Sequence, residues 1–251
     1  MKYYGMPYKG SKSQIAHWIL RNLPPAKHFY DLFGGGGSVA HLAAISGKYQ
    51  YIHYNEVDPL VCAGFQKFCN GDFKWERRWI SRDDFYEMRD SDPYASLAFS
   101  FGNNQRSYLY CREFEYWKRA LHYALVQFDF RPLEDMGIFI TRADKQCLDP
   151  HESEYKELYI SWLERTRPHK NYEYDFDKIR KQEGFCACET WRRIKRLRCN
   201  DPQLQNIIIT NLDYHDVNFE DDYVVYCDPP YLNTHKYRNY RRENGLGLLR
   251  L

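Results

Sequence analysis

A short apolar run near the end of the chain leads into the sequence Asp228-Pro229-Pro230-Tyr231. Residues 224–227 predict a buried strand, which has to end where two prolines cannot continue strand pairing. Proline lacks an N–H and fixes the backbone, so we expect the Asp228 carboxylate and the Pro229 carbonyl to face one crevice. Two such acceptors can hold both hydrogens of an amino group on a flat ring, whose nitrogen can then attack an electrophilic methyl group. An exposed β-turn is the simpler alternative, because Asp and Pro are common turn residues.

A run of four glycines, residues 34–37, follows a second predicted strand at residues 28–33. Glycine lets the backbone approach a ligand closely, and a turn of this kind between strand and helix is a common binding loop. Glu56 ends the next predicted strand about 20 residues later, where such folds place a carboxylate against a ribose hydroxyl. A dinucleotide would suit the same pattern, because Ala40 stands at the third glycine position of G-x-G-x-x-G and that position accepts alanine. A merely flexible loop is the remaining alternative.

A third group of candidate residues lies near the N-terminus, where Tyr8 and Lys12 precede a predicted helix at residues 14–23. The helix dipole disfavours a cation at the start of a helix. Lys12 therefore indicates an anionic ligand, with a solvated surface lysine as the alternative.

These side chains need a scaffold that brings strand ends together, and the order of the predicted elements supplies one. Strand, glycine loop, helix and strand follow one another between residues 28 and 70, which predicts a parallel sheet with right-handed crossovers. The same α/β pattern returns with a strand at residues 206–210, an acidic turn at Asp213 and the strand that leads to Asp228. The fold class is therefore α/β.

The stretch between these two parts, residues 72–200, predicts a mostly helical insert in a discontinuous catalytic domain formed by residues 1–71 and 201–251. A basic amphipathic segment at residues 191–198 and a polar loop at residues 100–106 carry side chains suited to phosphates and base edges. Each has a plainer alternative, which is an ordinary amphipathic helix for the segment and a capped turn for the loop.

The composition of the 251-residue chain narrows the function classes. Its formal net charge is +2, so any nucleic-acid surface has to be local. No stretch approaches the roughly 20 apolar residues of a membrane span, and the first residues lack the apolar core of a signal peptide. The eight cysteines include one close pair, Cys186 and Cys188, without a second pair to complete a zinc site. We therefore expect reduced thiols, no metal and a cytoplasmic protein.

Taken in order, the motifs resemble those of the Dam-like family of DNA adenine N6-methyltransferases, which includes phage and restriction-modification enzymes. The motifs are Tyr8-x-Gly10-x-Lys12, Asp31-x-Phe33-x-Gly35-x-Gly37-Ser38, Asn55-Glu56 and Asp228-Pro229-Pro230-Tyr231. The resemblance covers nearly the whole chain. It implies a Rossmann-like sheet that binds S-adenosylmethionine and an inserted helical domain that recognises double-stranded DNA.

The resemblance also implies roles for individual residues. The catalytic residues would be Asp228, Pro229, Pro230 and Tyr231, with Tyr231 stacked on a flipped-out adenine. The cofactor-binding residues would be Tyr8, Lys12, Phe33, Gly35, Gly37, Ser38, Glu56, Asp213 and Asp228. The loop would cradle the amino-acid end of the cofactor, and Glu56 would accept its ribose hydroxyls in place of the aspartate more usual in the family. Asp213 would lie near the cofactor's adenine.

Family members usually continue well beyond the Asp-Pro-Pro-Tyr turn, whereas only residues 232–251 follow it here. We therefore expect the C-terminal strands of the sheet to be missing, and a second chain could supply them because an unpaired edge invites pairing. An inactive DNA-binding fragment and an RNA methyltransferase are the alternatives to an active DNA adenine N6-methyltransferase. A nicotinamide-dependent oxidoreductase leaves the turn at residues 228–231 unexplained.

Overall fold

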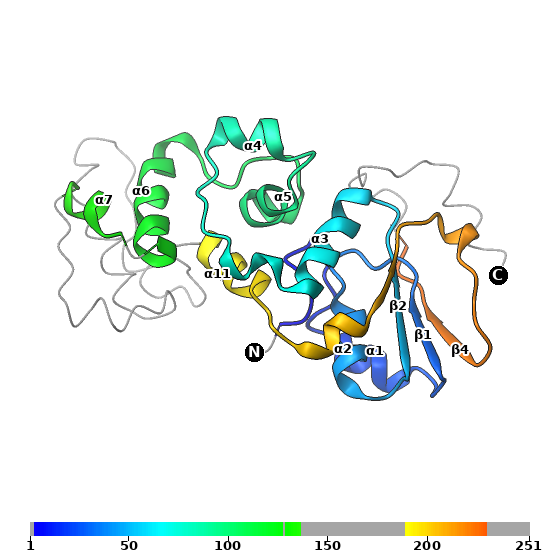
Figure 1. Cartoon of the computed structure of the whole chain (residues 1–251). Coiled ribbons are helices and arrows are strands. Elements are labelled where there is room, and N and C mark those ends of the chain that lie inside the picture. The colour runs from blue at the N-terminus through cyan, green and yellow to red at the C-terminus, as the bar shows by residue number, and fades with distance from the viewer. Residues whose placement is uncertain (1–2, 128, 137–188, 230–251) are drawn as a thin grey trace.

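A computed structural model of the chain describes residues 3–127, 129–136 and 189–229. Within these residues the fold centres on a four-stranded parallel sheet with the order β3-β2-β1-β4 (Figure 1). The strands are β1 His28–Asp31, β2 Tyr51–Asn55, β3 Ile208–Thr210 and β4 Tyr223–Tyr226. The predicted α/β class and parallel sheet are therefore confirmed.

Alternating side chains give the sheet two different faces. Phe29, Ile52 and Val224 occupy matching positions on β1, β2 and β4, and all three are buried in the core. Helix α2 (Ser38–Ser46) packs on β1 and β2, and α1 (Ala16–Asn22) packs on α2. On the opposite face Tyr30 and His53 stack with ring centroids 4.0 Å apart. The crossover through α2 thus brings the carboxyl ends of β1 and β2 to the same edge of the sheet.

Helix α3 (Pro59–Asn70) follows β2 and has clear signals at both of its ends. The Asp58 carboxylate accepts from the N–H groups of Leu60 and Val61, and Pro59 occupies the first turn, where its missing N–H does no harm. Gly71 ends the helix at φ +77°, a left-handed conformation that glycine adopts without strain. These caps hold the start of α3 directly beside Glu56.

The described part of residues 72–200 is mainly helical, and α6 and α7 lie farthest from the sheet (Figure 1). Trp117, Phe85, Phe99 and Leu121 are each at most 1% exposed, so this part has a buried core. Its elements are η1 Asp72–Trp75, α4 Arg82–Met88, α5 Pro93–Phe99, η2 Phe101–Asn103, α6 Arg112–His122, the π-helical turn Tyr123–Gln127, α7 Arg131–Glu134 and α11 Glu189–Leu197. The same core continues into α3 and η1, which pack against α5 and α11.

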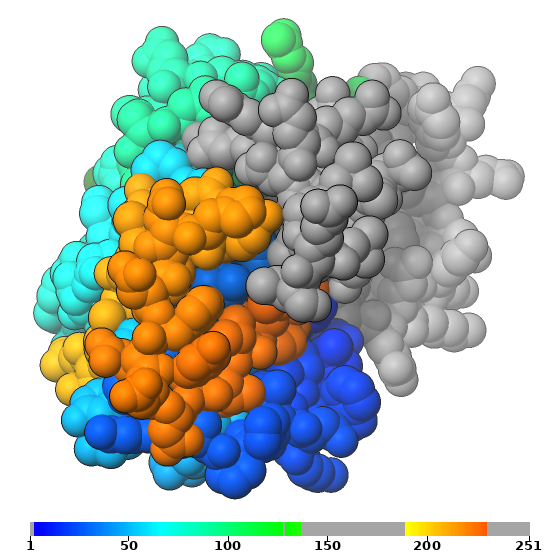
Figure 2. All heavy atoms as spheres, turned by 90° about the vertical axis from the view of Figure 1, so that its right-hand side faces the viewer, coloured from blue at the N-terminus to red at the C-terminus, as the bar shows by residue number. Residues whose placement is uncertain are grey.

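The chain returns to the sheet through the 3-10 helix η4 (Pro202–Asn206), which replaces the first residue of the strand predicted at residues 206–210. Pro202 starts this helix because its missing N–H is tolerated in a first turn. Figure 2 shows the residues that follow this helix, in orange, on the near side of the molecule beside the N-terminal part in blue. A short 3-10 helix, η5 (Tyr214–Asp216), then connects β3 to β4.

Some expectations stay predictions because they fall on residues that lie outside the described ranges. These include the expected absence of the C-terminal strands, the expected second chain that would supply them, and the expectation that the cysteines at 186 and 188 are reduced. Among the helices that the structure describes, none has the length and apolarity needed to cross a membrane.

Candidate active site

A cavity opens at the carboxyl ends of β1, β2 and β4, where parallel α/β sheets bind their ligands. The N-terminal segment, the glycine loop, the turn after β3 and the turn after β4 all contribute to its wall. The lining residues are Tyr8, Lys9, Gly10, Ser11, Lys12, Asp31, Leu32, Phe33, Gly34, Gly35, Gly36, Ser38, Val39, Asn55, Glu56, Val57, Asp58, Leu212, Asp213, Tyr214, Tyr226, Asp228 and Pro229.

The glycine loop is held tightly by its neighbours. The Tyr54 hydroxyl donates to the Gly35 carbonyl at 2.7 Å, and the ring of Tyr54 lies where a Cβ on Gly34 would have to be. Gly37 has φ +68° and packs against Phe65, so it forms the turn into α2. Gly37 is not among the residues that line the cavity, whereas Gly35 and Phe33 are. The backbone of the loop therefore faces the cavity on one side and a packed aromatic core on the other.

Glu56 lies at the base of the cavity and accepts two backbone hydrogen bonds. The Gly35 N–H donates to one carboxylate oxygen at 2.8 Å, and the Asp58 N–H donates to the other at 2.9 Å. Burial raises the pKa of Glu56 to about 7, against the lowering effect of these hydrogen bonds. The carboxylate therefore fixes the glycine loop to the start of α3, a structural role that its position in the sequence did not reveal. Each oxygen retains a second acceptor position for a ligand.

Asp31 is a second buried carboxyl group in the wall, which sequence reasoning placed in the motif but not among the binding residues. It is 2% exposed and accepts from the Ala40 N–H at 3.1 Å. Burial, together with the charges of Asp228 and Glu56, raises the pKa of Asp31 to about 7, while the hydrogen bond from Ala40 and the charge of Lys12 oppose the change. The inner wall of the cavity is therefore acidic.

Lys12 and Asp228 form an ion pair across the mouth of the cavity. Lys12 also donates to the Gly10 carbonyl at 3.2 Å. The argument from the helix dipole is corrected, because α1 begins at Ala16 and Lys12 lies outside its first turn. The negative group that Lys12 faces is a carboxylate of the chain itself.

The N-terminal segment packs directly on the glycine loop. The Tyr8 side chain lies against Gly35 and Gly36, where an added Cβ would come within 2.8 and 2.5 Å of it. The hydroxyls of Ser11 and Ser38 are 2.8 Å apart, which joins this segment to the first residue of α2. Tyr8 and Ser38 both line the cavity.

The turn after β3 brings an aromatic pair to the cavity. Tyr214 lies 5.4 Å from Phe33 between ring centroids, and its buried hydroxyl has no hydrogen-bond partner within the described ranges. The neighbouring Asp213 carboxylate pairs with the His215 ring at 2.8 Å. Sequence reasoning singled out Asp213 and missed Tyr214, although both belong to the same acidic turn.

The turn after β4 is described only as far as Pro229, which lines the cavity together with Asp228. Pro230 and Tyr231 lie outside the described residues, so the stacking role of Tyr231 stays a prediction.

The arginines of the basic segment at residues 191–198 do not all face outward. Arg193 is 5% exposed and pairs with Glu189 at 3.0 Å, while Arg198 donates to the Glu76 carbonyl at 2.7 Å. Arg196 donates to backbone carbonyls near the N-terminus. The expectation that this segment is a surface for phosphates is therefore wrong for Arg193, whose guanidinium is buried inside the chain.

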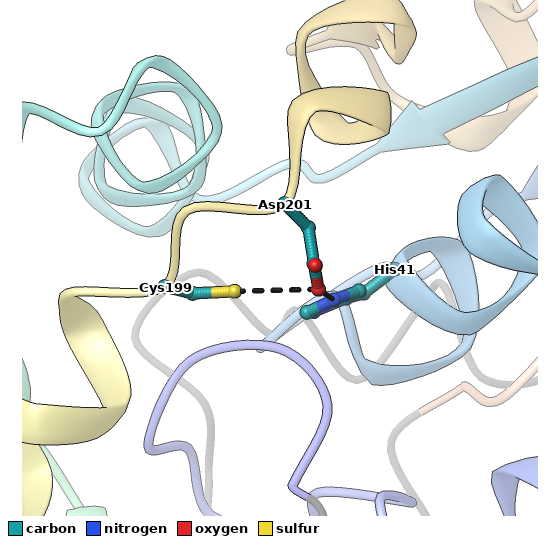
Figure 3. Close-up of side chains that lie close together, drawn as sticks. All are labelled: His41, Cys199 and Asp201. Atoms are coloured by element: carbon teal, nitrogen blue, oxygen red, sulfur yellow. Dashed lines mark hydrogen bonds and ion pairs between the residues drawn. The ribbon is translucent and has the colours of Figure 1, made fainter.

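A histidine of α2 meets a cysteine and an aspartate of the chain that follows α11 (Figure 3). His41 Nε2 lies 2.9 Å from Asp201, and the Cys199 thiol lies 3.6 Å from the same carboxylate oxygen. His41 Nδ1 accepts a hydrogen bond from the Gly5 N–H at 2.9 Å. Nε2 therefore carries the ring proton and donates a hydrogen bond to the Asp201 carboxylate. Because both ring nitrogens are engaged, this group forms a link between α2 and the chain that leaves α11.

A parallel sheet with a glycine loop after its first strand and carboxylates at the strand ends is typical of α/β enzymes that bind a nucleotide-like cofactor. The chain belongs to the D12 class N6 adenine-specific DNA methyltransferase family, whose model matches residues 8–248. It matches none of the curated proteins with which it was compared. The protein is therefore an S-adenosylmethionine-dependent enzyme that methylates adenine in DNA at N6, and the expected family is confirmed.

Proposed function

We propose that the cavity binds S-adenosylmethionine and that the turn at residues 228–231 holds an adenine flipped out of double-stranded DNA. The observation that carries the proposal is that Gly35, Glu56 and Asp228, far apart in the sequence, line one cavity at the carboxyl edge of a parallel sheet. When bound, the cofactor would supply a positively charged methylsulfonium as the electrophile.

The charges of the cavity suit such a ligand. Its wall carries Asp31, Glu56 and Asp228, and Lys12, one of the two lysines that line it, is paired with Asp228. A cationic ligand would favour the ionised forms of these carboxyls, which burial disfavours in Asp31 and Glu56. The donors and acceptors therefore fit a cofactor with a cationic centre and ribose hydroxyls.

Each part of the wall has a proposed task. Glu56 would accept the ribose hydroxyls with the acceptor positions that Gly35 and Asp58 leave. The loop of residues 33–36, with Ser38 and Tyr8 beside it, would hold the amino-acid end. Asp213 would lie near the cofactor's adenine. Gly37 would act through the shape of the turn, since it does not line the cavity.

The substrate adenine has to leave the stack of the duplex, which costs roughly a few kcal/mol. Asp228 and the Pro229 carbonyl would accept the two hydrogens of its amino group, and Tyr231 would stack on its ring. Lys12 would hold the Asp228 carboxylate in the direction that this requires. Alignment of the amino nitrogen with the methyl group would supply most of the rate gain.

DNA recognition is proposed for the insert at residues 72–200. The loop at its near end exposes Phe101 at 62%, and Asn103 and Gln105 take left-handed backbone angles at φ +55° and +59°. Such a loop can offer the exposed ring of Phe101 to a base for stacking.

Methyl transfer from radiolabelled S-adenosylmethionine to mixed-sequence duplex DNA tests the proposal, with N6-methyladenine identified after hydrolysis of the DNA. Asp228→Ala should abolish transfer, while Asp216→Ala, which removes an exposed carboxylate outside the cavity, should leave it unchanged. Soluble folded protein that methylates no DNA would contradict the proposal and favour an inactive DNA-binding protein. Faster methylation of duplex RNA would favour the RNA alternative.

A further inference from the structure

Arg196 is a partly buried cation of helix α11 that donates hydrogen bonds to the backbone of a distant segment. Its Nε donates to the Gly5 carbonyl at 2.8 Å, and one Nη donates to the Tyr4 carbonyl at 2.7 Å and to the Ser11 hydroxyl at 3.2 Å. Burial lowers the pKa of Arg196 to about 10. Within the described residues no carboxylate pairs with it, and its charge is stabilised by these neutral acceptors and by the ring of Tyr3, whose centroid lies 5.3 Å from the guanidinium carbon.

The same helix uses another arginine in a different way. Arg193, one turn earlier, pairs with Glu189 and donates to the carbonyls of Ala98 and Ser100, which end helix α5 and begin the exposed loop at residues 100–107. Arg193 therefore fixes α11 to α5 within the insert, and Arg196 fixes α11 to the N-terminal segment. One rigid turn of helix separates the two contacts.

The N-terminal segment at residues 3–12, which we call the arm, is the part of the chain that Arg196 holds. The arm contacts the glycine loop and α2 through the Met6 N–H, which donates to the Gly36 carbonyl at 2.7 Å, and through Ser38, which donates to the Tyr4 carbonyl at 3.0 Å. Its later residues are Tyr8, which packs on the glycine loop, and Lys12, which pairs with Asp228. A shift of the arm would therefore change both the wall of the cavity and the direction of the catalytic carboxylate.

Gly5 is the point at which the arm is held from both sides. Its carbonyl accepts from Arg196, and its N–H donates to His41, which in turn donates to Asp201 just after α11 (Figure 3). Gly5 has φ +69°, and a Cβ there would lie 2.2 Å from the Gly36 carbonyl oxygen. Arg196 in α11 holds Gly5 directly, and Asp201 after α11 holds it through His41. Both contacts keep Gly5 against the glycine loop.

We propose that Arg196 is a positioning residue that couples the DNA-binding insert to the cofactor cavity through the arm. The proposal rests on the proposed function, and it adds that DNA on the insert and S-adenosylmethionine in the cavity raise each other's affinity. Reciprocal coupling of this kind is required whenever one ligand stabilises the arrangement that the other binds.

The test uses Arg196→Met and the milder Arg196→Gln, which retains one amide donor, with Lys195→Met as the control. Lys195 is exposed on the same helix, so this control removes an equal charge without touching the arm. Affinity for S-adenosylmethionine is measured by calorimetry with and without saturating duplex DNA. Hydrogen exchange of residues 3–12 is measured without any ligand, and urea unfolding reports the stability of each variant.

Wild-type protein should bind the cofactor at least about fivefold more tightly when DNA is present. Arg196→Met should weaken cofactor binding on the order of tenfold without DNA, bring the effect of DNA close to one, and speed exchange in the arm but not in the sheet. Arg196→Gln should fall between, and it decides the question if the Met variant does not fold.

Folded Arg196 variants with the cofactor affinity, DNA effect and arm exchange of the wild type would overturn the inference alone. Wild-type protein that binds no S-adenosylmethionine would instead overturn the proposed function, and the inference with it. Loss of cofactor affinity in Lys195→Met to the same extent would also overturn the inference, because a general loss of charge would then explain the result.

Discussion

The carboxylate of Asp228 is joined to the ammonium of Lys12 by an ion pair that spans 216 positions of the chain. About one fifth of each side chain is exposed, 22% for Lys12 and 19% for Asp228, so water screens the pair only in part. The pair connects the arm to the turn after β4, which is proposed to receive the substrate. Under that proposal the catalytic geometry depends on the arm as much as on β4.

The Lys12–Asp228 pair leads to a prediction about non-additive kinetics. Lys12→Met should lower kcat/KM for methyl transfer on the order of tenfold or more, because the carboxylate loses the group that directs it. Asp228→Asn keeps an acceptor for the amine but loses the pair. The double variant should be less impaired than the sum of the two, by about 0.5–3 kcal/mol. Strictly additive losses would show that the pair does not act as a unit.

The buried carboxyls predict how stability depends on pH. The pKa values of Asp31 and Glu56 rise from 3.8 and 4.5 to about 7, so the ligand-free folded chain binds more protons than the unfolded chain in this range. Their contribution is therefore complete below the unfolded values and is lost as pH rises through about 7. Asp31→Asn, which can still accept from Ala40, should reduce the fall in unfolding free energy between pH 5 and pH 8.

Urea unfolding at several pH values without ligand measures this effect. Asp216→Asn, a change at an exposed carboxyl group outside the cavity, is the control. A stability profile of Asp31→Asn with the slope of the wild type would contradict the assignment.

Substitutions at the two glycines that flank α2 can distinguish the cost of backbone strain from the cost of a steric clash in the core. Gly37 and Gly47 have nearly equal angles, φ +68° and +67°, but a Cβ on Gly37 would lie 2.0 Å from the Phe65 ring, whereas a Cβ on Gly47 would meet nothing within 4 Å. Gly47→Ala should cost about 1–2 kcal/mol of unfolding free energy from backbone strain. Gly37→Ala should cost about 1–3 kcal/mol more, because the core has to move as well. Equal losses in thermal or urea unfolding would show that Phe65 gives way freely.

The exposed loop at residues 100–107 predicts two different effects on DNA binding. Arg106→Ala should weaken binding and make the dependence on salt less steep, since a phosphate contact releases counterions. Phe101→Ala should weaken binding by about 1–3 kcal/mol without changing the salt dependence, as expected for a lost stacking contact. Arg131→Ala, which removes an arginine side chain that is 82% exposed on α7, is the control in fluorescence titrations with labelled duplex. Losses equal to that of the control would place the DNA elsewhere.

The strand, loop and helix order was predictable because it rests on local patterns, and the glycine run marked the turn into α2 correctly. Glu56 was found from its spacing, but its hydrogen bonds to Gly35 and Asp58 were not, because they depend on the exact direction of a side chain. Arg193 and Arg196 were read as part of a basic surface, since charge alone does not show which side of a helix is buried. Tyr214 carries no pattern of its own and enters the cavity only because β3 lies beside β2.

The position of β4 also has a consequence for how the chain acquires its structure. β1 can pair with β2 soon after both are made, but its other neighbour is β4, about 195 positions later. At roughly 5–20 residues per second, synthesis leaves that edge of β1 waiting on the order of 10–40 s. Non-local pairing of this kind slows folding and exposes an unpaired strand in the meantime. Asp228 then reaches Lys12 only when β4 has joined the sheet, so this ion pair forms late in the folding of the described part of the chain.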